Sequence, residues 1–131
     1  MGNDNSEKVS VNINVATLSS IDLLVSQGYY SNRSDFINQA LRDALHQNQS
    51  TIDRIVEVKK KQDGWFLGIV GYTAADIEKL YVDGEKLDIR GYGMLVLDKN
   101  CDEEKLFCVV NSIKVKGKVR CSPTVKKHYN I

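Results

Sequence analysis

A change in hydrophobic period between residues 8 and 45 constrains the fold more than any other feature of this sequence. Apolar residues first alternate with polar ones, which predicts a β-strand with one buried face. The strand's apolar positions are Val9, Val11, Ile13 and Val15. The spacing then becomes helical at Leu18, Ile21, Leu24 and Val25, which share one face at 3.6 residues per turn. These positions predict a first helix over residues 17–27, ended by Gly28.

A second helix is expected to begin near Asn32, with an apolar stripe of its own. The stripe consists of Phe36, Ile37, Ala40, Leu41, Ala44 and Leu45. One strand and two short helices cannot bury this much apolar surface alone, and a lone strand leaves two edges of unpaired backbone groups. We therefore expect two copies of the chain to pair their strands antiparallel and to interleave their helices.

The turn between the two helices carries the most specific motif. Residues 28–37 read GYYSNRSDFI, which resembles the pattern G-x-(Y/F)-x-N-R-S-(D/E)-(F/A)-I of ribbon-helix-helix domains in the MetJ/Arc/CopG superfamily. The resemblance covers residues 8–46 of the 131. It implies a β-α-α unit that forms an intertwined homodimer and places a two-stranded ribbon in the DNA major groove. It also implies a prokaryotic, CopG-like transcriptional regulator, expected to act as a repressor.

The resemblance implies roles for individual residues, and their chemistry suits those roles. Base contacts would come from the outward ribbon residues Lys8, Ser10 and Asn12, because Asn can pair with adenine and Lys can reach guanine. Phosphate contacts would come from the start of the second helix, at Ser31, Asn32, Arg33 and Ser34, where free N–H groups favour anions. The dimer core would consist of Val9, Val11, Ile13, Leu18, Ile21, Phe36, Ile37 and Leu41. The alternative is a solvated edge strand followed by an ordinarily capped helix.

Charge is unevenly distributed along the chain. Residues 1–50 hold three Lys or Arg against five Asp or Glu, a net −2, and residues 51–131 hold 15 against 12, a net +3. A DNA-binding domain is usually basic, so backbone amides at the helix start would have to supply part of the phosphate binding. Later in the chain, alternate positions carry Lys114, Lys116, Lys118 and Arg120. In a strand they face one way, either as a solvated sheet face or as a stripe for nucleic acid or an acidic partner.

The sequence predicts an α+β protein with two folded parts. Residues 1–7 form a disordered arm, residues 47–52 a linker, and residues 53–131 a mixed α/β domain for oligomerisation or sensing. In that domain we expect a hairpin of strands 53–59 and 65–71 with Trp65 buried. Further strands are expected at 87–89, 93–97 and 115–121. Helices are expected at 74–82 after a Thr73 cap, from Asp102 to about 113, and from Ser122.

Residues suited to metal binding or catalysis are sparse. Cys101, Cys108 and Cys121 are separated by six and twelve residues, whereas structural zinc sites usually carry a C-x-x-C pair. We expect free thiols, no metal, no cofactor and no catalytic residues, so an enzyme is not predicted. No run of 18 apolar residues occurs, and the N-terminal MGNDNSEK lacks the apolar core of a signal peptide. The expected location is therefore the cytoplasm.

Two functions remain open from the sequence. The first is a sequence-specific, DNA-binding transcriptional regulator that binds double-stranded DNA as a homodimer or tetramer. The alternative is a protein-interaction module, either the antitoxin of a toxin–antitoxin pair or an adaptor. In that case residues 53–131 would bind a partner protein.

Overall fold

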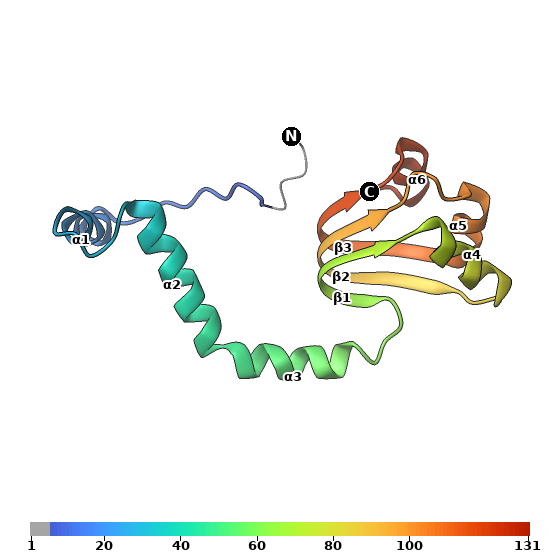
Figure 1. The fold of residues 1–131 in the computed structure, drawn as a ribbon, viewed down its shortest axis with the longest axis horizontal. Coiled ribbons are helices and arrows are strands. Elements are labelled where there is room, and N and C mark those ends of the chain that lie inside the picture. Colours follow the sequence, from blue (N-terminus) through green and yellow to red (C-terminus); the bar gives the residue numbers. More distant parts are fainter. Residues whose placement is uncertain (1–5) are drawn as a thin grey trace. The chain divides into compact units, whose positions relative to one another are not determined.

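The computed structural model describes residues 6–131, and the chain divides into two units, Met1–Ser50 and Thr51–Ile131 (Figure 1). The arm predicted over residues 1–7 therefore lies largely outside the described residues, and residues 6 and 7 have no regular secondary structure. Within residues 6–131, no helix has the length and apolar character needed to cross a membrane.

The N-terminal unit contains two helices, α1 (Val15–Ser26) and α2 (Arg33–Gln47). The Oδ1 atom of Asn14 accepts a hydrogen bond from the Ala16 N–H at 2.8 Å, so Asn14 caps α1. The helix begins two residues earlier than predicted. Val15, expected on the inner face of the strand, is instead the first residue of α1 and is exposed.

The α1–α2 turn forms as the sequence predicted. Gly28 takes a φ of +85°, its N–H donates to the Val25 carbonyl, and the Tyr29 N–H donates to the Leu24 carbonyl. A residue with positive φ at this position lets the last carbonyls of a helix find partners, which favours glycine. Leu18, Ile21, Leu24 and Val25 are buried or half-buried.

Residues 6–14 have no regular secondary structure in the single chain. A β-strand needs a neighbour to satisfy its backbone hydrogen bonds, and the described residues supply none for this segment. The predicted pairing with a second copy of the chain therefore stays a prediction.

The C-terminal unit alternates helices and strands. In chain order the elements are α3 (Gln49–Lys59), β1 (Trp65–Tyr72), α4 (Ala74–Val82), β2 (Leu87–Leu97), α5 (Glu103–Val109), β3 (Val110–Arg120) and α6 (Pro123–Tyr129). The strands form one sheet in the order β1-β2-β3, and both pairings are parallel. Parallel neighbours need a crossover connection, which α4 and α5 provide (Figure 1).

The prediction was wrong for residues 47–59. Neither a linker over 47–52 nor a strand over 53–59 is present, because α2 ends at Gln47 and α3 begins at Gln49. Ile52 and Val56 are half-buried and lie four residues apart, which is one turn of a helix rather than a strand repeat. The predicted hairpin is consequently absent, and β1 pairs in parallel with β2.

Two element boundaries in the C-terminal unit also differ from those predicted. Residues 87–89 and 93–97 belong to one continuous strand, β2. The helix capped by Asp102 ends at Val109 instead of 113, and β3 starts at Val110. By contrast, the predicted capping box of α4 is confirmed, since Thr73 and Asp76 each accept a bond from the other's backbone N–H.

Helices α4, α5 and α6 contribute to a core on one face of the sheet. Buried residues include Ile77 of α4, Leu106 of α5 and Val125 of α6, together with Ile89 and Leu95 of β2. This core makes the C-terminal unit a folded module.

Tyr129 ties α6 to the start of β3. Its hydroxyl donates to the Val110 carbonyl at 2.6 Å. Burial raises the pKa of Tyr129 to about 12, so the hydroxyl keeps the proton that it donates.

A row of glycines crosses all three strands. Gly68, Gly93 and Gly117 occupy paired positions, with φ of +111°, +129° and +143°. Figure 1 shows that the three strands bend together partway along their length. A Cβ on Gly93 would lie 1.8 Å from the Gly68 carbonyl oxygen, and one on Gly117 would lie 1.9 Å from that of Gly93. The bend therefore requires glycine both for its backbone angle and for the close approach of the strands.

Within residues 6–131, the helices that form the core, α4, α5 and α6, leave the opposite face of the sheet open. Leu67 and Tyr92 are neighbours in the register and are 53% and 55% exposed. Trp65, predicted to be buried, is half-buried and lies on this open face. Its burial was predicted from a hairpin that does not form. Parallel sheets are normally covered on both faces, so this exposure is unusual.

Candidate nucleic-acid interface

The start of α2 is built by an exchange of hydrogen bonds around Asn32. The Asn32 Oδ1 atom accepts from the Asp35 N–H at 2.8 Å, as in a capping box, and Asp35 Oδ2 accepts from the Ser31 N–H at 2.9 Å. In a standard box the carboxylate would return to Asn32 itself. The second helix therefore begins next to Asn32, as predicted. The reciprocal bond of the box is displaced by one residue, because it reaches Ser31 and not Asn32.

This arrangement leaves two backbone amides available at the helix start. The Phe36 N–H donates to the Asn32 carbonyl at 3.2 Å, and the N–H groups of Ser31 and Asp35 are also engaged. Among the described residues, the amides of Arg33 and Ser34 have no acceptor. Adjacent free amides at the positive end of a helix are suited to a phosphate oxygen.

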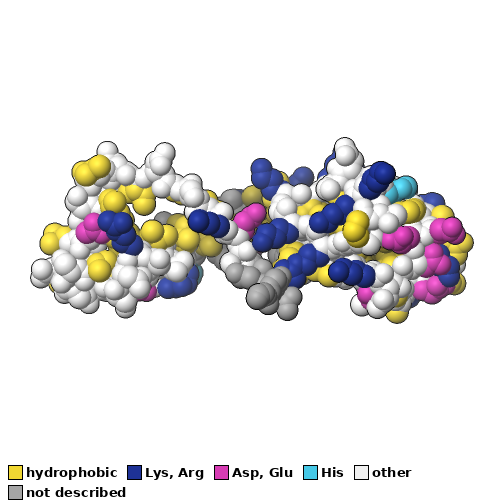
Figure 2. Space-filling view, turned by 90° about the horizontal axis from the view of Figure 1, so that it is seen from above, with side chains coloured by type: hydrophobic (Ala, Val, Ile, Leu, Met, Phe, Trp, Pro, Cys, Tyr) yellow, Lys and Arg dark blue, Asp and Glu magenta, His cyan; other side chains and the backbone are white. Residues whose placement is uncertain are grey.

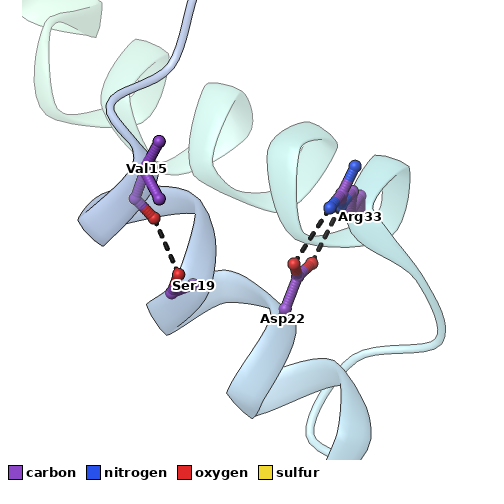
Figure 3. A network of polar contacts seen from close by, with 4 residues as sticks. All are labelled: Val15, Ser19, Asp22 and Arg33. Atoms are coloured by element: carbon purple, nitrogen blue, oxygen red, sulfur yellow. Dashed lines mark hydrogen bonds and ion pairs between the residues drawn. The ribbon is translucent and has the colours of Figure 1, made fainter.

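Arg33 also forms the ion pair that joins α1 to α2. Figure 3 shows its guanidinium beside the Asp22 carboxylate, with Nε to Oδ1 at 2.8 Å and Nη2 to Oδ2 at 2.9 Å. A hydrogen bond from Arg33 and its positive charge lower the pKa of Asp22 below its ordinary value. Arg33 retains three of its five N–H groups that can still donate to a phosphate.

The predicted base-contacting residues lie in the segment without secondary structure. Lys8, Ser10 and Asn12 are all exposed. Val9 and Val11, which alternate with them, are 76% and 73% exposed. No hydrogen bond or ion pair within residues 6–131 joins the three polar residues to the start of α2. The single chain therefore does not bring the two predicted contact sets together.

The predicted dimer-core residues are mostly unburied in the single chain. Ile21 is 6% exposed and is the one buried hydrophobic residue of the described N-terminal unit. Leu18 and Phe36 are half-buried, with the Phe36 ring edge-on to Tyr30 at 4.9 Å. Exposed members of the set are Val9, Val11, Ile13, Ile37 and Leu41. The unit therefore has apolar surface but almost no core of its own.

One functional feature was missed in the sequence. Asp22 is absent from the predicted functional residues, whereas it binds Arg33 bidentately. The signal was present, because opposite charges flank a tight turn between two helices and are brought close when the helices pack.

The described N-terminal unit has a helix pair with free amides at the start of α2, and an unpaired segment of alternating apolar and polar residues precedes it. This arrangement is the one expected of a DNA-binding protein that pairs two chains through a β-ribbon. A family model described as the Ribbon-Helix-Helix transcriptional regulator family matches residues 4–126. The chain belongs to this family, and it is therefore a DNA-binding regulator of transcription. No curated protein and no solved structure gives a significant match.

Proposed function

We propose that the protein is a sequence-specific transcriptional repressor that acts as an intertwined dimer. In this proposal, residues 8–14 of two chains pair as an antiparallel ribbon that enters the major groove. The supporting observation is the N-terminal unit itself, which buries one hydrophobic residue and exposes alternating valines in an unpaired segment. Bound across a promoter, such a dimer would obstruct transcription, and for this reason we assign repression.

Dimerisation would remove two sources of instability in the N-terminal unit, unpaired backbone groups and exposed apolar side chains. Paired ribbons would satisfy the backbone N–H and C=O groups of residues 8–14. They would also shield Val9, Val11 and Ile13, which gain about 1.5–3 kcal/mol for each side chain fully removed from water. The outward residues Lys8 and Asn12 would then form a polar ridge on the ribbon.

Phosphate binding by α2 would position this ridge on the duplex. The free amides of Arg33 and Ser34 would hold one phosphate in each protomer, assisted by the hydroxyl of Ser31 and the side chain of Asn32. Backbone contacts of this kind fix register and orientation without reading sequence. They also reduce the need for cations, which suits a segment of net charge −2.

Base recognition is tested by a gel-shift assay on a duplex from the promoter of the protein's own gene. Asn12→Ala should weaken specific binding by about 1–3 kcal/mol per lost base contact and leave binding to unrelated DNA nearly unchanged. Asn111→Ala, at an exposed asparagine of β3, is the matched control. Equal affinity of both variants for the promoter, or no binding of the wild type at low salt, contradicts the proposal.

The role of Arg33 is tested by removing its competitor. Asp22→Asn takes away a negative charge and loosens the ion pair, so the guanidinium becomes freer to bind phosphate. We expect tighter DNA binding and a steeper dependence of affinity on salt, together with a lower melting temperature. A variant that loses stability without any gain in DNA affinity would assign Arg33 a purely structural role.

A further inference from the structure

The open face of the C-terminal sheet contains a hollow with cationic and aromatic walls. Its volume is about 510 Å³, within the range of about 300–1,000 Å³ typical of small-molecule sites. The lining side chains include Trp65, Arg90, Tyr92, Lys114 and Lys116 of the sheet and Lys59 of α3. None of them is acidic. Within residues 6–131, the cations Lys59, Arg90, Lys114 and Lys116 have no ion-pair partner.

The strand register explains why these side chains meet. Trp65, Arg90 and Lys114 occupy paired positions on β1, β2 and β3. Two residues further along, Leu67, Tyr92 and Lys116 form a second row. Alternate residues of a strand share a face, so each row runs from an apolar edge to a cationic edge. Figure 2 shows Lys and Arg gathered on one side of the C-terminal unit, with Asp and Glu mainly on the other.

A second, smaller hollow adjoins the first. Its volume is about 210 Å³, and it shares Gln62, Trp65 and Arg90 with the larger one. Its remaining lining residues are Asp63 and Asp88, and Asp88 Oδ1 already accepts from the Ser112 hydroxyl at 2.7 Å. The carboxylates thus line the smaller hollow and the lysines line the larger one, while Trp65 and Arg90 line both.

We infer that this double hollow binds a nucleoside polyphosphate. The planar base would stack on Trp65 or Tyr92, as bases do on aromatic side chains. The phosphates would be held by Lys59, Lys114 and Lys116, and the ribose hydroxyls could donate to Asp63 or Asp88. Such a ligand has phosphates for the lysines, a flat ring for the aromatic side chains and hydroxyl donors for the carboxylates.

The charges of the lining residues favour a nucleotide over two other occupants of the open face, a second copy of the chain and a single-stranded polynucleotide. A second copy packed on the same face would bring Arg90, Lys114 and Lys116 against their own equivalents, and like charges repel. A single-stranded polynucleotide would suit the lysines, but its phosphates would continue past the carboxylates of Asp63 and Asp88. A single nucleotide avoids both conflicts.

Trp65 provides a direct readout, since it is the only tryptophan in the sequence. The test titrates the full chain with each of the four ribonucleoside triphosphates and follows Trp65 fluorescence. Parallel titrations use tripolyphosphate, adenosine and a homopolymeric single-stranded oligonucleotide. We expect at least one triphosphate to quench Trp65 saturably, and both tripolyphosphate and adenosine to bind more weakly.

Variants then locate the site. The double substitution Lys114→Ala and Lys116→Ala removes two exposed cations and should weaken nucleotide binding roughly tenfold or more. Lys127→Ala, at an exposed lysine of α6, is the control and should bind as the wild type does. Circular dichroism melts check that each variant folds, and Lys116→Ala alone serves if the double variant does not.

Several results would overturn the inference. They are the absence of quenching by any triphosphate at millimolar concentration, tripolyphosphate binding as tightly as the best nucleotide, and the oligonucleotide binding more tightly than every mononucleotide. Equal loss of affinity in Lys127→Ala would do the same. A failure to bind nucleotide can be distinguished from a failure of the proposed repressor function. The fluorescence assay contains no duplex DNA, and the gel-shift variants alter only residues outside the hollow.

Discussion

At the scale of single residues, the ion pair of Asp22 and Arg33 gives the N-terminal unit a dependence on pH. The pKa of Asp22 is lowered in the folded chain by its hydrogen bond from Arg33, so folding favours the ionised carboxylate. The ion pair therefore stabilises the folded N-terminal unit fully above the ordinary Asp pKa of about 3.9. This stabilisation is lost as the pH falls through the lowered pKa of Asp22. It is absent in strong acid.

This prediction is checked by NMR titration of the Asp22 carboxyl group. In the wild type the midpoint should lie below that of an unpaired aspartate, and in Arg33→Gln it should return toward the ordinary value. Asp76 provides an internal reference, because a hydrogen bond from the Thr73 N–H lowers its pKa and the substitution should leave that pKa unmoved. An unchanged Asp22 midpoint in Arg33→Gln would show that the pair does not persist in solution.

The three cysteines differ in their surroundings and should differ in reactivity. Cys101 and Cys121 are each 8% exposed, whereas Cys108 is exposed. Burial raises the pKa of the Cys101 and Cys121 thiols, which disfavours the reactive thiolate. We expect a chromogenic disulfide reagent to modify one thiol quickly in the native protein and all three after denaturation. Cys108→Ser should abolish the fast phase, and a fast phase that survives contradicts the assignment.

Helix caps were the residues that the sequence predicted best. Asn32, Thr73, Asp102 and Ser122 each accept a hydrogen bond from a backbone N–H at a helix start. A cap depends on a few neighbouring residues, so a local pattern is enough to identify it. Trp65 could not be placed in the same way, because its exposure depends on which strand pairs with β1 and what covers that face.

At the scale of elements, the errors have a common physical cause. In residues 52–59, Ile52, Ile55, Val56 and Val58 fit both a loose alternation and a helical stripe, and short apolar runs are ambiguous between the two. Because residues 53–59 were predicted to be a strand, the turn at residues 62–64 was predicted to connect the two strands of a hairpin. The direction of strand pairing is set by tertiary packing, which no local pattern reveals.

The glycine-rich part of β2 misled the prediction in a different way. Gly91 lies in the break predicted between strands 87–89 and 93–97, whereas it is inside one continuous strand. A Cβ on Gly91 would lie 2.1 Å from the Phe66 carbonyl oxygen. Such a close approach follows from the pairing of β1 with β2, and no local pattern in the sequence predicts that the three strands bend as a set.

The glycine row yields a prediction about the stability of the sheet. Gly68→Ala meets no atom within 4 Å, so its cost is the strain of positive φ alone, about 1–3 kcal/mol. Gly93→Ala adds a collision with the Gly68 carbonyl and should cost more than about 3 kcal/mol. Denaturant unfolding followed by Trp65 fluorescence compares the two. Equal destabilisation would mean that the strands can separate enough to admit a Cβ.

At the scale of the whole molecule, the two units differ in how their stability is supplied. The C-terminal unit buries side chains from three helices and from β2 and β3 around its own core, and partly buried residues of β1 pack against it. The described N-terminal unit buries Ile21 alone. It exposes apolar residues on α2 and in residues 9–13, which have no regular secondary structure. We therefore expect this unit to gain most of its hydrophobic stabilisation from a second molecule. The family assignment agrees with this, since regulators of this family bind DNA generally as dimers.

The dependence of the N-terminal unit on a partner can be tested with a matched pair of substitutions. Val11 and Val82 are 73% and 72% exposed in the single chain, so exposure alone predicts that a charge is tolerated equally at both. If Val11 lies in a dimer core, Val11→Asp buries an uncompensated charge there and should cost about 3–5 kcal/mol of dimer stability. Val82→Asp, on α4, should leave the dimer intact.

Sedimentation equilibrium distinguishes these outcomes directly. The wild type and Val82→Asp should have twice the mass of the chain, with melting temperatures that rise with protein concentration. Val11→Asp should sediment as a monomer whose N-terminal helices are largely unfolded, while the C-terminal unit keeps its Trp65 signal. A monomeric wild type, or a Val11→Asp dimer as stable as that of Val82→Asp, would remove the basis for a paired ribbon and for its insertion in the major groove.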